Sequence, residues 1–353
     1  PPADGTWLAE SWLRMGWMAT PGGSGTGVEN TAEVAPGTMI ASVLVDGDAT
    51  LAAGGTVTEI RGDRLWAFGH PSFGAGATLT PMARAHVVAV LPNLMSSFKF
   101  FTVGEPVGAV VADRKDGIVG LLGHEAPMVP IRVQVDEEKS SFRAVRHPVL
   151  LPLLTAFLSQ AGQNVTGRMF GDQTVRTRVE IRYPEYDPVV VESISAGGQA
   201  GADAAGFVGA VVAYLENSPF ERPDVESIDV RIERAEEIEA ATILEIIPDR
   251  RVVRAGEELD VRFRIQPYRG PEFVRTVRVS IPRSLPKGRI DLVGADGAAW
   301  MAYDLQMRPL APASFADEVR LVNSLEPSNR LVAALERRDL GMAVAGGSLS
   351  LIH

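Results

Sequence analysis

The stretch MIASVLVDGDATLAAGGTVTEIRGDRLWAFGHP, residues 39–71, decides the fold of the first half of this chain. Short apolar runs alternate in it with turn signals such as Gly47-Asp48, and the pattern continues to Val135 at a spacing of about 8–12 residues. Short runs at this spacing, punctuated by Gly-Asp, Asn and Pro, are typical of antiparallel strands. We therefore expect residues 36–187 to form a closed or nearly closed antiparallel β-barrel.

The remainder of the chain predicts a second β domain and a few short helices. From Ile228 to Ile281 the predicted strands alternate apolar and charged residues, which is typical of an immunoglobulin-like sandwich. Helical patterns are expected in Leu153–Gln160, at the end of Ala196–Ala213 and over Asn329–Arg338. The expected organisation of this mainly β chain is an aromatic segment with a Gly-rich loop (1–35), the barrel (36–187), a connecting α/β segment (188–227), the sandwich (228–315) and a tail with a short helix (316–353).

Composition narrows the classes of function. The 353 residues carry a formal net charge of -10, and Lys and Arg form no basic stripe, so nucleic-acid binding is disfavoured. The chain has no Cys, which excludes disulfides and thiolate chemistry, and its apolar runs are too short to span a bilayer. Peripheral association with a membrane complex is compatible with this composition. Because the sequence starts at Pro1-Pro2 without Met, we expect a processed or partial product.

Three tryptophans stand out near the start of the chain. Trp7, Trp12 and Trp17 follow one another at intervals of five residues and precede a Gly-rich tract over residues 21–27. Large aromatic side chains dominate buried contact energy, so these residues are candidates for a docking surface toward a protein partner or a second copy of the chain. The alternative is that they pack on the chain's own barrel.

The turn Ala67-Phe68-Gly69-His70-Pro71 carries the main candidate for chemistry. It directly follows a predicted strand, so its histidine is presented to solvent or a cleft. Imidazole titrates near neutral pH, and a positioned His can accept and return a proton. The alternative is a structural histidine whose ring hydrogen-bonds across the turn. His86, His124 and His147 are too scattered for metal-ligand spacing, so no metal is expected. The glycines at 54–55 and 74–76 lack the Lys-Ser/Thr or the acidic partner of a phosphate-binding loop, and no cofactor is expected.

Ten short motifs, in one order across about 100 residues, resemble the SpoIVB-type serine peptidases and the bacterial envelope proteins that carry the same domain. They are Pro36-Gly37, Gly47-Asp48, Gly55-Thr56-Val57-Thr58, Ala67-Phe68-Gly69-His70-Pro71, Pro81-Met82-Ala83-Arg84-Ala85, Ser97-Phe98-Lys99, Gly104-Glu105-Pro106-Val107-Gly108, Asp113-Arg114, Gly117-Ile118-Val119-Gly120 and Pro127-Met128-Val129-Pro130-Ile131. The segments Ile228 to Gly288 and Leu331 to Gly347 are similar, less distinctively, to the regions C-terminal to this domain in longer envelope relatives. The resemblance implies a peptidase-like barrel in an extracytoplasmic protein of the periplasm, the cell envelope or the secreted fraction.

The resemblance also implies roles for individual residues. In these peptidases the Gly-His turn supplies the catalytic histidine, which carries over onto His70 as general base. A Gly-x-Ser-Gly-x-Pro stretch supplies the nucleophile there, and this sequence lacks it; Ser24 matches it only loosely and is otherwise a serine of a flexible linker. Asp113 is a candidate to orient His70 as the acid of a triad, or it forms a structural pair with Arg114. In the long envelope relatives the serine motif precedes the Gly-His turn, which would place it upstream of Pro1.

Two interpretations of the function stay open. We predict an extracytoplasmic envelope protein whose peptidase-like barrel is non-catalytic as given and serves as a scaffold or protein-binding module, because the missing serine motif, the tryptophans and the appended sandwich favour it. The alternative is a serine endopeptidase with His70 as general base and its nucleophile on a segment outside this sequence. The intact Ala67–Pro71 turn favours that alternative, since a scaffold has no evident need for imidazole.

Overall fold

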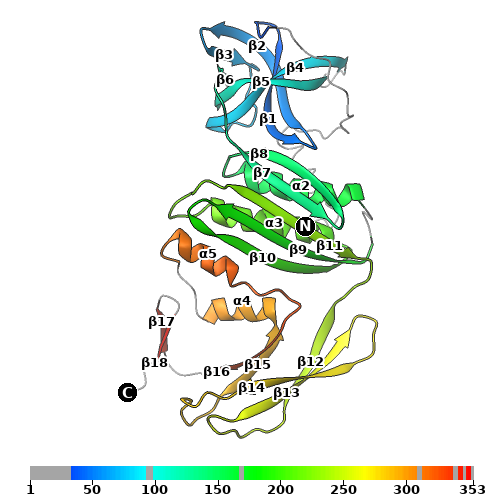
Figure 1. Ribbon diagram of the computed structural model, residues 1–353, viewed down its shortest axis with the longest axis vertical. Coiled ribbons are helices and arrows are strands. Elements are labelled where there is room, and N and C mark those ends of the chain that lie inside the picture. Colours follow the sequence, from blue (N-terminus) through cyan, green and yellow to red (C-terminus); the bar gives the residue numbers. More distant parts are fainter. Residues whose placement is uncertain are drawn as a thin grey trace.

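The computed structural model describes residues 33–92, 98–166, 171–307, 312–336, 341–344 and 347–350. In this part the chain is mainly β, as the sequence predicts, and the helices lie between residues 150 and 323. Figure 1 shows an elongated molecule in which a ring of strands, a sheet with helices and a smaller β layer follow one another along the long axis. None of the helices in the described ranges is long and apolar enough to cross a membrane.

Six strands at one end of the molecule pair into a closed ring. They are β1 (Met39–Gly47), β2 (Leu51–Arg61), β3 (Arg64–Ala67), β4 (Gly76–Leu91), β5 (Phe98–Arg114) and β6 (Gly117–Leu122). The antiparallel order is β1-β2-β3-β6-β5-β4, and β4 pairs again with β1, so that hydrogen bonding closes on itself. Apolar side chains fill the interior, among them Ile40, Leu65, Met82 and Ile118, each at most 1% exposed. The apolar runs of residues 39–71 thus supply buried residues of this interior, and β1 is buried at seven consecutive positions.

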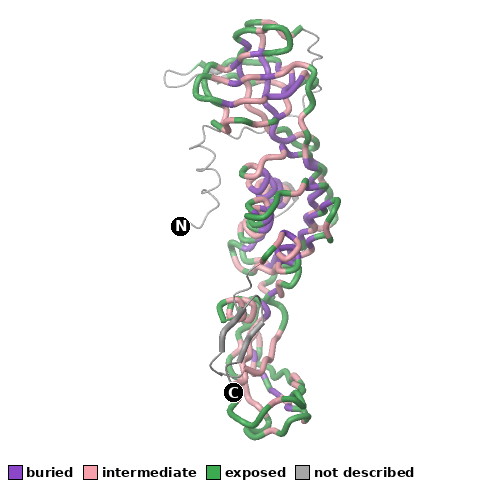
Figure 2. Tube along the Cα trace, turned by 90° about the vertical axis from the view of Figure 1, so that its left-hand side faces the viewer, coloured by how far each residue is buried: buried purple, intermediate pink, exposed green. Residues whose placement is uncertain are grey.

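The end of β1 joins the ring to a second sheet, because Val45–Gly47 pair with β8. This sheet has the order β10-β9-β11-β7-β8, with β11 parallel to β7. Its strands are β7 (Met128–Val135), β8 (Glu138–Val145), β9 (Gln173–Tyr183), β10 (Tyr186–Gly197) and β11 (Ser227–Ala235). The helices α2 (Leu150–Thr166) and α3 (Ala200–Glu216) lie side by side on it (Figure 1), which confirms both helical predictions in this region. Figure 2 shows the buried residues concentrated between these helices and the sheet.

Helix α2 begins with a histidine cap. His147 precedes Pro148, and proline suits the first helical position because its missing N–H would have no intrahelical partner there. The ring Nδ1 of His147 accepts hydrogen bonds from the backbone N–H groups of Val149, at 3.2 Å, and Leu150, at 3.3 Å. Only an unprotonated Nδ1 can accept these bonds. Burial lowers the pKa of His147 below the ordinary value of 6.5, in agreement with a neutral ring.

We expect this cap to make the stability of the second sheet depend on pH. A lowered pKa in the folded state means that the stabilisation is complete above 6.5, the pKa of the unfolded chain, and is lost as the pH falls from there through the lower pKa of the folded state. The variant His147→Asn caps the helix at every pH and should remove about 1 kcal/mol of acid sensitivity between pH 7 and pH 5. Urea unfolding at several pH values measures this, with His124→Asn as the exposed control. Equal acid sensitivity in both variants would contradict the cap.

The third layer contains two small sheets packed face to face. One is formed by β12 (Ala241–Pro248), β13 (Glu258–Pro267) and β14 (Phe273–Ser280), and the other by β15 (Asp291–Asp296) and β16 (Leu331–Glu336). Phe263 is fully buried between them. It fits because β15 has a glycine there: a Cβ on Gly294 would lie 2.6 Å from Cε1 of Phe263. Helix α4 (Gly297–Met307) follows β15, and β17 (Gly341–Val344) pairs with β18 (Gly347–Ser350).

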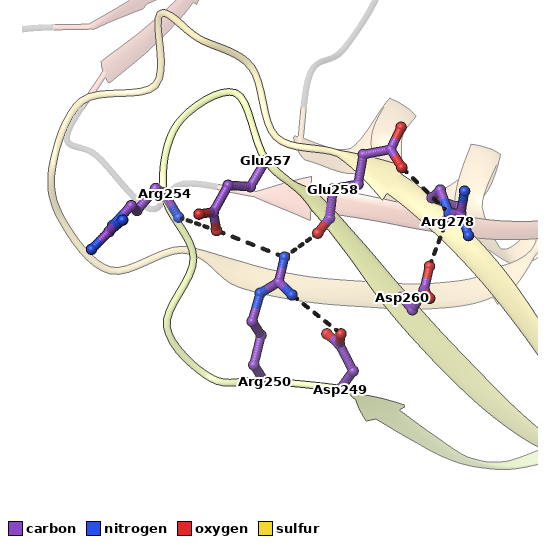
Figure 3. Close-up of polar contacts among 7 residues, drawn as sticks. All are labelled: Asp249, Arg250, Arg254, Glu257, Glu258, Asp260 and Arg278. Carbon is purple, nitrogen blue, oxygen red and sulfur yellow. Dashed lines mark hydrogen bonds and ion pairs between the residues drawn. The ribbon is translucent and has the colours of Figure 1, made fainter.

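An exposed network of ion pairs surrounds the turn between β12 and β13 (Figure 3). Arg278 Nε lies 3.1 Å from Asp260 Oδ1 and 3.4 Å from Glu258 Oε2, and Arg250 Nη1 lies 3.4 Å from Asp249 Oδ2. Surface pairs of this kind contribute little to stability because water screens them. We therefore assign the network a local role in shaping the turn.

Helix α5 (Phe315–Asn323) returns from the third layer to the second sheet and covers the free edge of β10. The Asn323 side chain accepts a hydrogen bond from the Val190 N–H at 2.7 Å and donates one to the Pro188 carbonyl at 3.1 Å. It thereby satisfies two backbone groups of an edge strand that would otherwise be open to another chain.

Several elements differ from the sequence predictions. Ile228–Glu233, expected as the first strand of the sandwich, belongs to β11 in the middle of the second sheet. The helix predicted over Asn329–Arg338 is wrong, since Leu331–Glu336 form β16 and pair with β15. Leu331, Ala334 and Leu335 have helical spacing, but tertiary pairing overrides so weak a preference. The predicted boundaries after residues 187, 227 and 315 lie inside β10, at the start of β11 and inside α5.

Candidate functional site

The candidate site is the loop Phe68–Ala75, which connects β3 to β4 at one end of the ring. Phe68 and Gly69 have φ values of 77° and 74°, so two consecutive residues lie in the left-handed region. This conformation is costly for a bulky residue such as phenylalanine. The contacts of the loop have to hold it there, and two of them are specific.

The first contact holds Phe68 against β2. Its backbone N–H donates to the Thr56 carbonyl at 3.0 Å. Its ring lies directly on Gly55, because a Cβ on Gly55 would come within 2.2 Å of the ring atom Cδ1 of Phe68. The small residue at position 55 is therefore required to seat the aromatic ring beside the histidine.

The second contact is a carboxylate clamp from β5. Asp113 is 3% exposed, and its carboxylate accepts hydrogen bonds from three backbone N–H groups of the loop. These are Ser72 to Oδ1 at 2.8 Å, Phe73 to Oδ2 at 2.6 Å and Ala75 to Oδ2 at 3.3 Å. Hydrogen bonds to a charged acceptor are the stronger kind. The clamp fixes the loop directly after His70.

His70 itself is exposed at the outer side of this loop. Its ring Nδ1 lies 2.8 Å from the carbonyl oxygen of Pro71, and the ring centroids of His70 and Phe68 are 5.8 Å apart. A carbonyl oxygen can only accept, so Nδ1 carries the proton in this contact. In the neutral ring the lone pair is then on Nε2, which has no hydrogen-bond partner within the described ranges. The arrangement can accept a proton or a hydrogen bond from a bound group.

The structure separates the residues that the sequence proposes for a triad. The Asp113 carboxylate binds the loop backbone, and within the described ranges no hydrogen bond joins it to the imidazole. The sequence leaves two roles open for Asp113, the acid of a triad or a structural pair with Arg114. These contacts agree with a structural role, although the partners are backbone N–H groups and not Arg114. Ser24 and the tryptophans Trp7, Trp12 and Trp17 lie outside the described residues. The Ser72 hydroxyl, two residues from His70, is buried and makes no hydrogen bond in the described part, to the imidazole or to any other group.

Two other histidines make contacts within their own segments of the chain. His147 caps α2, and Nδ1 of His124 lies 3.3 Å from the Leu122 carbonyl. Among the residues whose positions are described, no group of three or more His, Asp or Glu side chains is placed to hold a metal ion.

Sequence reasoning missed three features of the site. The seat at Gly55 and the hydrogen bond at Thr56 come from β2, the strand that pairs with β3, whereas the clamp from Asp113 comes from β5 and spans 41 residues to Ser72. The sequence does single out Gly55-Thr56 and Asp113-Arg114 as short motifs, but a motif does not show which residues it contacts. Comparison of the chain with models of protein families, with curated proteins and with solved structures found no match.

Proposed function

We propose that this chain is an extracytoplasmic protein of a bacterial envelope, and that its ring of strands is a SpoIVB-peptidase-like barrel acting as a protein-binding scaffold. The observation that carries the proposal is the way His70 is held. An exposed imidazole with Nδ1 fixed on the Pro71 carbonyl offers Nε2 to a bound polypeptide, whose N–H and O–H groups are donors. The strained loop at Phe68 supports a functional purpose, because strain of this kind persists where a site requires it.

The third layer fits the scaffold as a presentation module. We propose that its two sheets form an immunoglobulin-like sandwich, which agrees with the core around Phe263 and with the exposed charges on β13 and β14. The third layer lies at the opposite end of the long axis from the ring that carries the His70 loop (Figure 1). It can therefore keep this loop at a distance from a surface to which the third layer is attached.

The hydrogen bond from His70 Nδ1 to the Pro71 carbonyl also favours a second candidate function. In serine peptidases the general base donates from Nδ1 to an acceptor and takes the proton of the nucleophile at Nε2. The Pro71 carbonyl supplies such an acceptor here. With a serine contributed by a segment outside this sequence, or by Ser24, His70 would be the general base of an endopeptidase.

Two measurements on the full chain test both functions. Long-range proton–nitrogen NMR spectra should show the neutral ring of His70 protonated at Nδ1, with His70→Gln identifying the signals. Reaction with a fluorophosphonate probe should give no labelling that depends on His70. Labelling that disappears in His70→Ala would contradict the scaffold and establish the endopeptidase, whereas a ring protonated at Nε2 would contradict both.

A further inference from the structure

We infer that the rim around His70 binds carboxylate groups, so that the partner is an acidic polypeptide. This inference rests on the proposed function and names the class of its partner. It depends on three cations, Lys99, Arg114 and Lys115, which the fold brings to the two sides of the His70 loop.

Lys99 lies on the side of β2. Its Nζ donates to the hydroxyl of Thr56 at 3.2 Å, and the carbonyl of the same residue accepts from the Phe68 N–H at 3.0 Å. One residue therefore links the ammonium group of Lys99 to the residue that seats the histidine. The Lys99 side chain is exposed.

Arg114 and Lys115 lie on the other side, at the end of β5 and in the turn that leads to β6. This turn is held against the His70 loop by Gly117, where a Cβ would come within 2.6 Å of the Ala67 carbonyl and 3.3 Å of the Gly69 nitrogen. The preceding residue, Asp113, clamps the same loop. Arg114 and Lys115 are exposed, and one exposed acid, Asp116, shares their turn.

Among the residues whose positions are described, none neutralises the charges of these cations. Arg132 and Arg143 on the second sheet form forked hydrogen bonds with Asp229 and Asp46, whereas Lys99, Arg114 and Lys115 form no ion pair with any described residue. The chain as a whole has a formal net charge of -10 and repels anions at long range. At physiological ionic strength charges are screened beyond about 8 Å, so a local group of cations still attracts carboxylates.

A peptide pair that differs only in charge tests this inference. One fluorescein-labelled peptide alternates Glu and Ala, and the other, of equal length, alternates Gln and Ala. Fluorescence anisotropy should show the Glu peptide binding more tightly to the full chain, with an affinity that falls as salt is added. The double variant Arg114→Gln and Lys115→Gln should weaken it by about threefold to tenfold.

The matched control is Lys139→Gln with Arg251→Gln. Lys139 is exposed near the start of β8 and Arg251 is exposed in the segment between β12 and β13, both away from the His70 loop in the sequence, and the pair removes the same charge. Equal weakening by both double variants, or equal affinity for both peptides, would overturn the inference. If both peptides bind with equal affinity and His70→Ala abolishes this binding, the acidic partner is contradicted but the scaffold proposal stands. The two proposals are therefore tested by different variants.

Discussion

The variant Asp113→Asn is expected to lose about 2–4 kcal/mol of unfolding free energy and to release the His70 loop. The carboxylate accepts from the N–H groups of Ser72, Phe73 and Ala75 in a site where Asp113 is 3% exposed. An amide has one acceptor oxygen, and its NH2 group would face N–H donors. At least one buried donor then loses its partner, which carries the full cost of desolvation.

Hydrogen exchange of the loop amides and denaturant unfolding measure this effect. The amides of Ser72 and Phe73 should exchange much faster in Asp113→Asn than in the parent chain. Asp116→Asn is the control, because Asp116 is exposed in the adjoining turn and should change stability by less than about 0.5 kcal/mol. If the two variants unfold alike and the loop amides stay protected, the clamp does not hold the loop.

The variant Phe315→Ala should have a still larger effect, about 3–5 kcal/mol, on the second sheet. Phe315 is fully buried, and its ring lies 5.1 Å from that of Tyr183 and 4.9 Å from that of Tyr186, measured between centroids. Its loss would leave a cavity between α5 and the β9–β10 hairpin. It would also free the edge of β10, since α5 carries the Asn323 amide that caps it.

Hydrogen exchange resolved by segment is the appropriate measurement, because the ring and the second sheet need not unfold together. Protection should fall in β9, β10 and α3 and stay unchanged in β2, β3 and β6. Phe220→Ala serves as the control, since Phe220 is 43% exposed and its removal leaves no cavity. A loss of protection no greater than in this control would mean that α5 is not part of the core.

Sequence reasoning located most strands of the ring but not their full length. The runs Met39–Val45 and Ile118–Leu122 correspond to β1 and β6, whereas β4 and β5 are much longer than the runs His86–Leu91 and Val107–Val111. Prolines and glycines within those strands, such as Pro81 and Pro106, look like breaks in a sequence. In the structure β4 and β5 pair through these positions with several shifts of register, which accommodate residues that a regular ladder does not.

The candidate site, too, is predictable from the sequence only in part. The Gly-His turn is visible in the sequence because Gly69 and Pro71 mark a turn directly after a strand. The role of Asp113 is not visible, because an Asp-Arg dipeptide at a turn has the same appearance whether it caps itself or binds a loop. Only contact with Ser72 and Phe73 distinguishes these cases.

The sequence by itself determined that the chain is mainly β, where β1 and β6 of the ring lie, that α2 and α3 are helices, and that His70 stands on a turn. Tertiary structure alone decided that β11 pairs with β7 and β9, that α5 completes the second sheet, and that Asp113 clamps the His70 loop. The physical reason is that the periodicity of a sequence shows which face of a segment is apolar, but not which other segment packs against that face. The choice among them depends on contacts such as Asn323 to Val190, which join residues 133 positions apart.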